Sequence, residues 1–294
     1  MTQQDPPPRR SFPPLLLAVL GIGLLVGMDG VAKALGAQMP TLQLAFLRFL
    51  VTAVLAAILH LALGAPLPGR AALRANLPRG LLLAGSTLGF FFALVRLPLA
   101  EVLALSFLAP VLVGLLSPAM LGERPGRAAW GALGLGFAGV VVCAAGQGFG
   151  EASGQPLPQR LAGIGAVLAS AFAYAVSIVL LRQRARHDGV LAVVLLQSAV
   201  PAVLLLLPAA ATWQAPDTAA VLPALLGLGV LGVAGHLALA QAFARGEASR
   251  LVVSEYTGLA WAMAIGFLFF AEIPAPATLA GAALILAACL LVRH

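Results

Sequence analysis

Charged side chains are scarce in this sequence. Only 9% of its 294 residues are Asp, Glu, Lys or Arg, whereas a soluble domain carries about 25%. With 61% hydrophobic residues and a mean hydropathy of +1.03, the chain lacks the polar groups needed to cover a water-facing surface. A soluble fold is therefore excluded, and the composition predicts an integral membrane protein.

Cysteines, alternating strand patterns and nucleotide-binding motifs are also rare or absent. The two cysteines, Cys143 and Cys289, lie inside apolar runs without metal-ligand spacing, so we expect packing residues and no metal site. The apolar runs are continuous rather than alternating, which argues against a transmembrane β-barrel. No phosphate loop or nucleotide-binding box occurs, so we expect no cofactor and no ATP-driven pumping by this chain.

Long apolar runs are abundant, and they predict the fold class. A helix needs about 20 apolar residues to cross a bilayer, and ten such runs can be counted. We therefore expect an all-α integral membrane protein with short connections. The predicted spans are residues 15–36, 42–63, 79–96, 99–121, 127–146, 160–181, 190–211, 220–244, 250–271 and 276–293.

A weak internal duplication relates the two halves of the chain at a constant offset of 149 positions. Each half has five spans, and an odd number makes the second half enter the membrane from the opposite side, so we expect inverted repeats. The matching positions are Ala93-Leu94-x-Arg96 with Ala242-Phe243-x-Arg245, Glu123 with Glu272, Lys33 with Arg182, and Arg48 with Gln197.

The repeats predict the domain boundaries. Residues 15–146 and 160–294 are expected to form the two five-helix repeats. Residues 147–159, rich in Gly, Pro and Gln, are expected to link them, and residues 1–14 to form a cytoplasmic tail.

The distribution of Arg and Lys predicts the orientation, because cytoplasmic loops of membrane proteins carry an excess of these residues. With the N-terminus inside, thirteen fall in inner loops and termini, among them Arg79 and Arg182. Only Arg96 and Arg160 fall in outer loops. We therefore expect both termini in the cytoplasm. The net charge of +7 then reflects topology, and no nucleic acid partner is expected.

Two helix ends, together with the ten spans and the duplication, carry a family resemblance. One segment contains Pro110 and ends at Leu121-Gly122-Glu123-Arg124, and the other is Phe269-Phe270-Ala271-Glu272. With these features the chain resembles the drug/metabolite transporter superfamily, EamA-type, over nearly its whole length. The resemblance implies a bacterial inner-membrane protein whose central cavity is lined by the first, third, fourth, sixth, eighth and ninth helices. One departure is that Pro110 has Leu259 at its repeat position.

The resemblance implies a secondary active transporter of small organic metabolites that works by alternating access and is not an enzyme. Amino-acid export is the leading hypothesis, and uptake of S-adenosylmethionine or a related metabolite is the alternative. A membrane-embedded enzyme using Glu255 and His236 as acid and base, and a passive channel, are hypotheses of other classes. The expected partners are a small-molecule substrate, the lipid bilayer, and protons as a coupling ion.

Three charged residues are predicted within the membrane, near the outer ends of the first two spans. Asp29 and Lys33 are four positions apart, so they share one face of a helix. At a rise of 1.5 Å per residue, Asp29 and Arg48 both lie roughly 10 Å deep. Because a charge at membrane depth costs at least about 2.5–3.5 kcal/mol, we predict an Asp29–Arg48 pair. It is either a structural clamp or a group that takes part in substrate binding or coupling.

Glu255 is the sharpest candidate for the substrate site. It lies about five residues into the ninth predicted span, next to Tyr256. A carboxylate beside an aromatic ring can hold an ammonium or sulfonium group, and it can also carry a proton. The competing interpretation is an acid that complements the helix dipole and pairs with Arg250. Its repeat counterpart is Ser106, next to Phe107, so the two halves are expected to contribute unequally.

The remaining candidates are polar or aromatic residues in or near the predicted spans. His236 can titrate near neutral pH, although a hydrogen-bonded packing residue is the competing interpretation, and ordinary packing competes for the aromatic residues. The other substrate-binding candidates are Tyr174, His236, Gln241, Phe91 and Trp261. The expected gate or loop anchors are Arg96 with Glu101 at the outer interface, and Glu123 and Glu272 at opposite faces.

Overall fold

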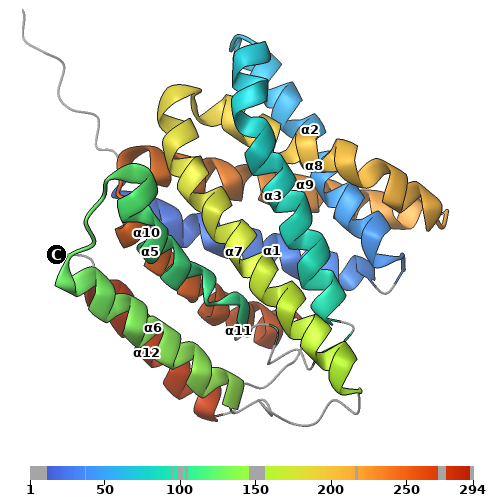
Figure 1. Cartoon of the computed structure of the whole chain (residues 1–294). Coiled ribbons are helices and arrows are strands. Elements are labelled where there is room, and N and C mark those ends of the chain that lie inside the picture. The colour runs from blue at the N-terminus through green and yellow to red at the C-terminus, as the bar shows by residue number, and fades with distance from the viewer. Residues whose placement is uncertain are drawn as a thin grey trace, which may run out of the picture.

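The computed structural model describes residues 12–36, 38–94, 96–97, 102, 105–145, 156–215, 218–270 and 276–291. These residues form helices and connecting turns, and none of them lies in a strand (Figure 1). The elements are α1 (Pro14–Gly36), α2 (Thr41–Ala62), α3 (Arg70–Leu94), α5 (Ala109–Leu121), α6 (Arg127–Ala145), α7 (Leu157–His187), α8 (Val190–Ala211), α9 (Thr218–Arg245), α10 (Ala248–Leu251), the 3₁₀ segment η1 (Val252–Tyr256), α11 (Thr257–Phe270) and α12 (Pro276–Leu291).

The helices have the length and surface of membrane-spanning segments. Among the described residues, five segments are long and apolar enough to cross a bilayer: α1, α2, α7, α8 and Val221–Arg245 of α9. Large apolar side chains cover the exterior, as at Val203 and Leu207, which are 71% and 79% exposed. Exposed apolar surface of this kind requires lipid rather than water around it. The prediction of an all-α, multi-pass membrane protein is confirmed.

Several predicted helix ends differ from the observed ones. The third helix begins at Arg70 instead of residue 79, and the sixth continues to His187 instead of ending at 181. Hydropathy detects only the apolar part of a helix, whereas both helices continue into polar sequence that packs on neighbours. The ninth predicted span is divided into α10, η1 and α11. Most of the predicted linker 147–159 lies outside the described residues, and α7 begins within it.

Helix packing repeats between the two halves of the chain. Helix α1 packs along α9, and their repeat counterparts α7 and α3 pack along each other (Figure 1). Two helices pack directly against their own counterparts, α2 against α8 and α6 against α12. At the residue level, a Cβ on Gly21 would lie 3.1 Å from the Gly235 carbonyl oxygen. The counterparts of these residues, Ser170 and Ser86, have their Oγ atoms 3.1 Å apart. The fold therefore contains the expected inverted repeats.

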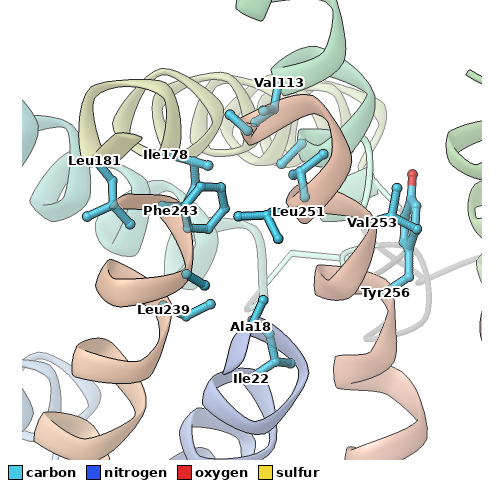
Figure 2. Close-up of a cluster of buried hydrophobic side chains, with 14 of the residues drawn as sticks. Ala18, Ile22, Val113, Ile178, Leu181, Leu239, Phe243, Leu251, Val253 and Tyr256 are labelled. Atoms are coloured by element: carbon cyan, nitrogen blue, oxygen red, sulfur yellow. The ribbon is translucent and has the colours of Figure 1, made fainter. Parts of the chain in front are cut away.

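The pseudo-two-fold axis passes close to the broken ninth helix. Phe107 and Tyr256 are repeat counterparts, and their ring centroids lie 6.0 Å apart. Counterparts can touch only near the axis that relates them. Tyr256 is fully buried, and its hydroxyl donates a hydrogen bond to the Leu133 carbonyl oxygen at 3.4 Å. Figure 2 shows Tyr256 and Val253 in the same apolar cluster as residues of α1, α5, α7 and α9.

The contact between α6 and Tyr256 yields a test of this packing. A Cβ at Gly136 would collide with Cδ2 of the buried Tyr256 ring. We expect Gly136→Ala to destabilise the protein by about 1–3 kcal/mol, because the ring cannot move without disturbing the core. Thermal unfolding of the purified protein in detergent measures this effect. Gly134→Ala is the control, since a Cβ there meets no atom within 4 Å. Equal melting temperatures for the two variants would contradict the packing.

Candidate functional site

A hydrogen-bonded polar pair lies between α7 and η1. The Tyr174 hydroxyl donates to the Glu255 carboxylate, at 3.2 Å from both Oε1 and Oε2. Both residues are candidates for the substrate site from the sequence, but their contact was not predicted. Pairing of Glu255 with Arg250 was wrong, because Arg250 Nε lies 2.9 Å from Oε2 of Glu247. Among the described residues, the Glu255 carboxylate is thus bonded to a neutral donor and has no ion-pair partner.

The local sequence explains why the helix breaks at Glu255. The Ser254 hydroxyl donates to the Leu251 carbonyl oxygen at 2.7 Å, and the Thr257 hydroxyl donates to the Ser254 carbonyl oxygen at 2.6 Å. Hydroxyls that bond to nearby carbonyls compete with regular helix hydrogen bonds, and a 3₁₀ stretch within a longer helix often marks a functional hinge. Glu255 lies in this stretch and is only partly buried.

Arg79 is a polar residue of the site that sequence reasoning missed. Its placement in a cytoplasmic loop was wrong, because α3 begins nine residues earlier and places it inside the bundle. The residue is 3% exposed, and its Nε donates to the Ser177 carbonyl oxygen at 3.1 Å. It stands directly before a long apolar run, where an arginine is usually assigned to the loop. The local sequence contains no signal that the helix continues, because Asn76 and Pro78 are both unfavourable inside a helix.

Arg79, Arg48, Tyr174, His236 and Glu255 form what we name the central polar cluster. Tyr174 is hydrogen-bonded to Glu255, and Arg79 contacts Ser177, one turn along α7 from Tyr174. The charges of Arg48 and Arg79 are expected to act on Tyr174 and His236. These side chains come from α2, α3, α7, α9 and η1, so both repeats contribute. The cluster places a carboxylate and two cations inside an otherwise apolar bundle.

The predicted Asp29–Arg48 pair is confirmed. Arg48 Nη1 lies 3.0 Å from Asp29 Oδ1, and the side chains are 29% and 55% exposed. Arg48 thus connects this ion pair to the central polar cluster. The Lys33 side chain lies outside the described part of the structure.

Several other predicted binding residues make packing contacts in this conformation. Tyr256 lies in the hydrophobic core with Phe107 against it. The Ser106 hydroxyl donates to the Val102 carbonyl oxygen at 2.7 Å. The remaining contacts are Trp261 Nε1 donating to the Val19 carbonyl oxygen at 3.2 Å, Phe91 packing edge-on against Phe90, and Gln241 Oε1 accepting from Arg245 at 3.4 Å.

Glu123 anchors the end of α5, in agreement with the prediction of a loop anchor. Its Oε1 accepts from Arg182 Nε at 3.1 Å, and its Oε2 accepts from the Ser249 backbone N–H at 3.4 Å. Arg182 also donates to the Phe243 carbonyl oxygen at 2.6 Å. The assignment of Arg182 to a loop was wrong, because it lies within α7 and is 4% exposed. This Glu123–Arg182 clamp joins the first repeat to three helices of the second.

The predicted outer gate is only partly described. Arg96 lies over the ring of Phe92, with Cζ 3.4 Å from the ring centroid, and donates to the Phe92 carbonyl oxygen at 2.9 Å. Glu101 and Glu272 lie outside the described residues. Within the part of the chain that the structure describes, no group of three or more His, Cys, Asp or Glu side chains is arranged to hold a metal ion.

Comparison with known proteins identifies relatives of this chain. The family model described as the EamA-like transporter family matches residues 13–145 and 161–293. Two proteins named pseudopaline exporter CntI, from two strains of Pseudomonas aeruginosa, are 27% and 28% identical over 276 and 279 residues, covering 94% of each chain. A solved crystal structure with 24% identity has the same fold, with a TM-score of 0.77 over 95% of this chain and 97% of the other.

Proposed function

This chain belongs to the EamA-like transporter family and is therefore a membrane transporter rather than an enzyme, and we propose that it exports small organic zwitterions such as amino acids. The observation that carries the choice of substrate is the Tyr174–Glu255 pair with arginines nearby. A transporter that binds an ammonium group in an apolar bundle needs an anion for it, and the substrate's own carboxylate needs a cation. The central polar cluster contains both.

The relatives support the direction of transport. Both curated relatives are named as exporters, and the alignment extends over 94% of each chain. Transport of pseudopaline is stated of those relatives, and we do not extend that substrate to this chain. Export of an organic metabolite is therefore the part of their activity that we transfer to this chain.

Alternating access is the mechanism that the symmetry favours. Inverted repeats allow two conformations of similar energy, one open to each side of the membrane. The repeat counterparts Phe107 and Tyr256 meet at the axis, and Glu255 directly precedes Tyr256. A substrate held by Glu255 would then lie near the pivot and be exposed to either side. The Glu123–Arg182 clamp crosses between the repeats, and we propose that it closes one side.

The distribution of arginines supports the proposed orientation. With the N-terminus placed inside and Arg79 and Arg182 removed from the inner group, eleven of the Lys and Arg residues would fall inside and two outside. This bias favours a cytoplasmic position of both termini. We propose the inner membrane of a bacterium as the location.

Counterflow in proteoliposomes tests the proposed function. Vesicles loaded with an unlabelled amino acid are expected to accumulate the labelled form transiently and saturably, whereas protein-free vesicles do not. A panel of amino acids and S-adenosylmethionine, measured at two pH values, separates the substrates and tests for proton coupling. Accumulation of S-adenosylmethionine alone would contradict amino-acid export. Flux that neither saturates nor shows counterflow would indicate a channel.

A further inference from the structure

Arg79 is a buried cation with unused hydrogen-bonding capacity. Its Nε donates to the Ser177 carbonyl oxygen, but its buried Nη1 has no hydrogen-bond partner among the described residues. The Ser177 hydroxyl, which is also fully buried, has no partner there either. The unpaired Arg79 Nη1 and the unpaired Ser177 hydroxyl thus belong to two residues that already contact each other. Buried donors are normally satisfied in native proteins, so this pair calls for an acceptor.

The surroundings of Arg79 indicate what that acceptor is. No carboxylate among the described residues lies within ion-pair distance of Arg79. Tyr174 precedes Ser177 by three positions on α7, so the two side chains share a face of that helix. Tyr174 therefore lies one turn of α7 from the residue that Arg79 contacts, and its hydroxyl donates a hydrogen bond to the Glu255 carboxylate. Opposite charges thus flank a single tyrosine.

We propose that Arg79, assisted by the Ser177 hydroxyl, binds a carboxylate group of the transported molecule. This inference rests on the proposed function and extends it by assigning the anionic end of the substrate. A guanidinium presents several N–H groups in a fixed plane and binds carboxylates through two parallel hydrogen bonds. Arg79 supplies such a group, and its contact with Ser177 holds it in place.

Binding at two points makes a specific prediction about ligand chemistry. A molecule with both an ammonium and a carboxylate group engages Glu255 and Arg79. An amine without a carboxylate engages only Glu255, and an N-acylated amino acid engages only Arg79. Loss of one protein charge should therefore weaken one class of ligand and spare the other.

The experiment measures binding of three probes to purified protein in detergent: L-phenylalanine, N-acetyl-L-phenylalanine and phenethylamine. Arg79→Gln is expected to weaken binding of the two carboxylates about tenfold or more, with little effect on phenethylamine. Arg79→Lys is expected to retain more carboxylate binding than Arg79→Gln. Arg74→Gln is the matched control, since Arg74 is exposed on the same helix and should behave as wild type. If Arg79→Gln does not fold, Arg79→Lys and Ser177→Ala serve as the tests, with carboxylate binding alone expected to fall.

Three results would overturn the inference. The first is an absence of carboxylate binding in the wild type. The second is an equal loss of all three probes in the Arg79 variants, which would indicate a structural role, and the third is an unchanged carboxylate affinity in Arg79→Gln. Counterflow of L-phenylalanine by the same preparations keeps this test separate from the proposed function. Normal counterflow with unchanged carboxylate affinity in Arg79→Gln overturns the inference alone. Carboxylate binding that depends on Arg79 without any counterflow overturns the export of amino acids and supports the inference.

Discussion

Glu255→Gln is expected to lower counterflow of an amino-acid probe by about 10- to 100-fold without reducing the amount of folded protein. Hydrogen bonds to a charged group contribute about 1.5–3 kcal/mol, and every 1.4 kcal/mol changes an equilibrium tenfold. Glutamine has nearly the same shape and still accepts the Tyr174 hydroxyl. The change therefore removes the negative charge while preserving the contact between η1 and α7.

Rates per folded protein molecule, with apparent affinities, measure this effect. Glu247→Gln is the matched control, because Glu247 lies eight positions earlier and its 49% exposed side chain pairs with Arg250 at the surface. Tyr174→Phe is expected to lower transport by a smaller factor, because it keeps the Glu255 carboxylate and removes only the hydrogen bond that the Tyr174 hydroxyl donates to it. A wild-type rate in Glu255→Gln would refute the assignment of the cation site.

Glu123→Ala is expected to cause the largest loss of stability, about 3–5 kcal/mol, because it leaves a buried charge without its partner. The side chains of Arg182 and Glu123 are only 5% and 11% exposed. Arg182 would keep its bond to the Phe243 carbonyl oxygen, which is neutral and cannot replace a carboxylate. The loss should exceed that expected for Gly136→Ala.

Thermal unfolding in detergent tests the clamp, with Glu247→Ala as the control. The Glu247–Arg250 pair is about half-exposed and is expected to contribute at most about 1 kcal/mol. The double variant Glu123→Ala/Arg182→Met is expected to be more stable than Glu123→Ala, because it removes the uncompensated charge as well. Equal losses in Glu123→Ala and Glu247→Ala would show that the buried clamp contributes no more than a surface pair.

Some features of the site could be predicted from the sequence because they depend on local geometry. The Asp29–Arg48 pair follows from helical rise, since both residues lie at similar depth on consecutive spans. The inverted repeats follow from the constant offset and the odd number of spans. Glu255 was identified because an isolated carboxylate in an apolar run needs a functional or structural reason.

Other features could not be predicted because they depend on contacts between distant segments. Tyr174 and Glu255 are 81 positions apart, and no sequence pattern specifies that they meet. Arg79 and Arg182 were assigned to loops because hydropathy marks the end of an apolar run rather than the end of a helix. Each of these arginines lies next to an apolar run, but packing by neighbouring helices encloses it.

The sequence by itself determined that this chain is a helical membrane protein with two inverted halves, because apolar composition, span length and span parity suffice for that conclusion. Only the tertiary structure decided which charges are enclosed and which atoms they contact. The Glu123–Arg182 clamp and the unpaired Nη1 of Arg79 arise where helices from both halves meet. Burial of a charge depends on all the helices that surround it, so it cannot be predicted from any single segment of the sequence.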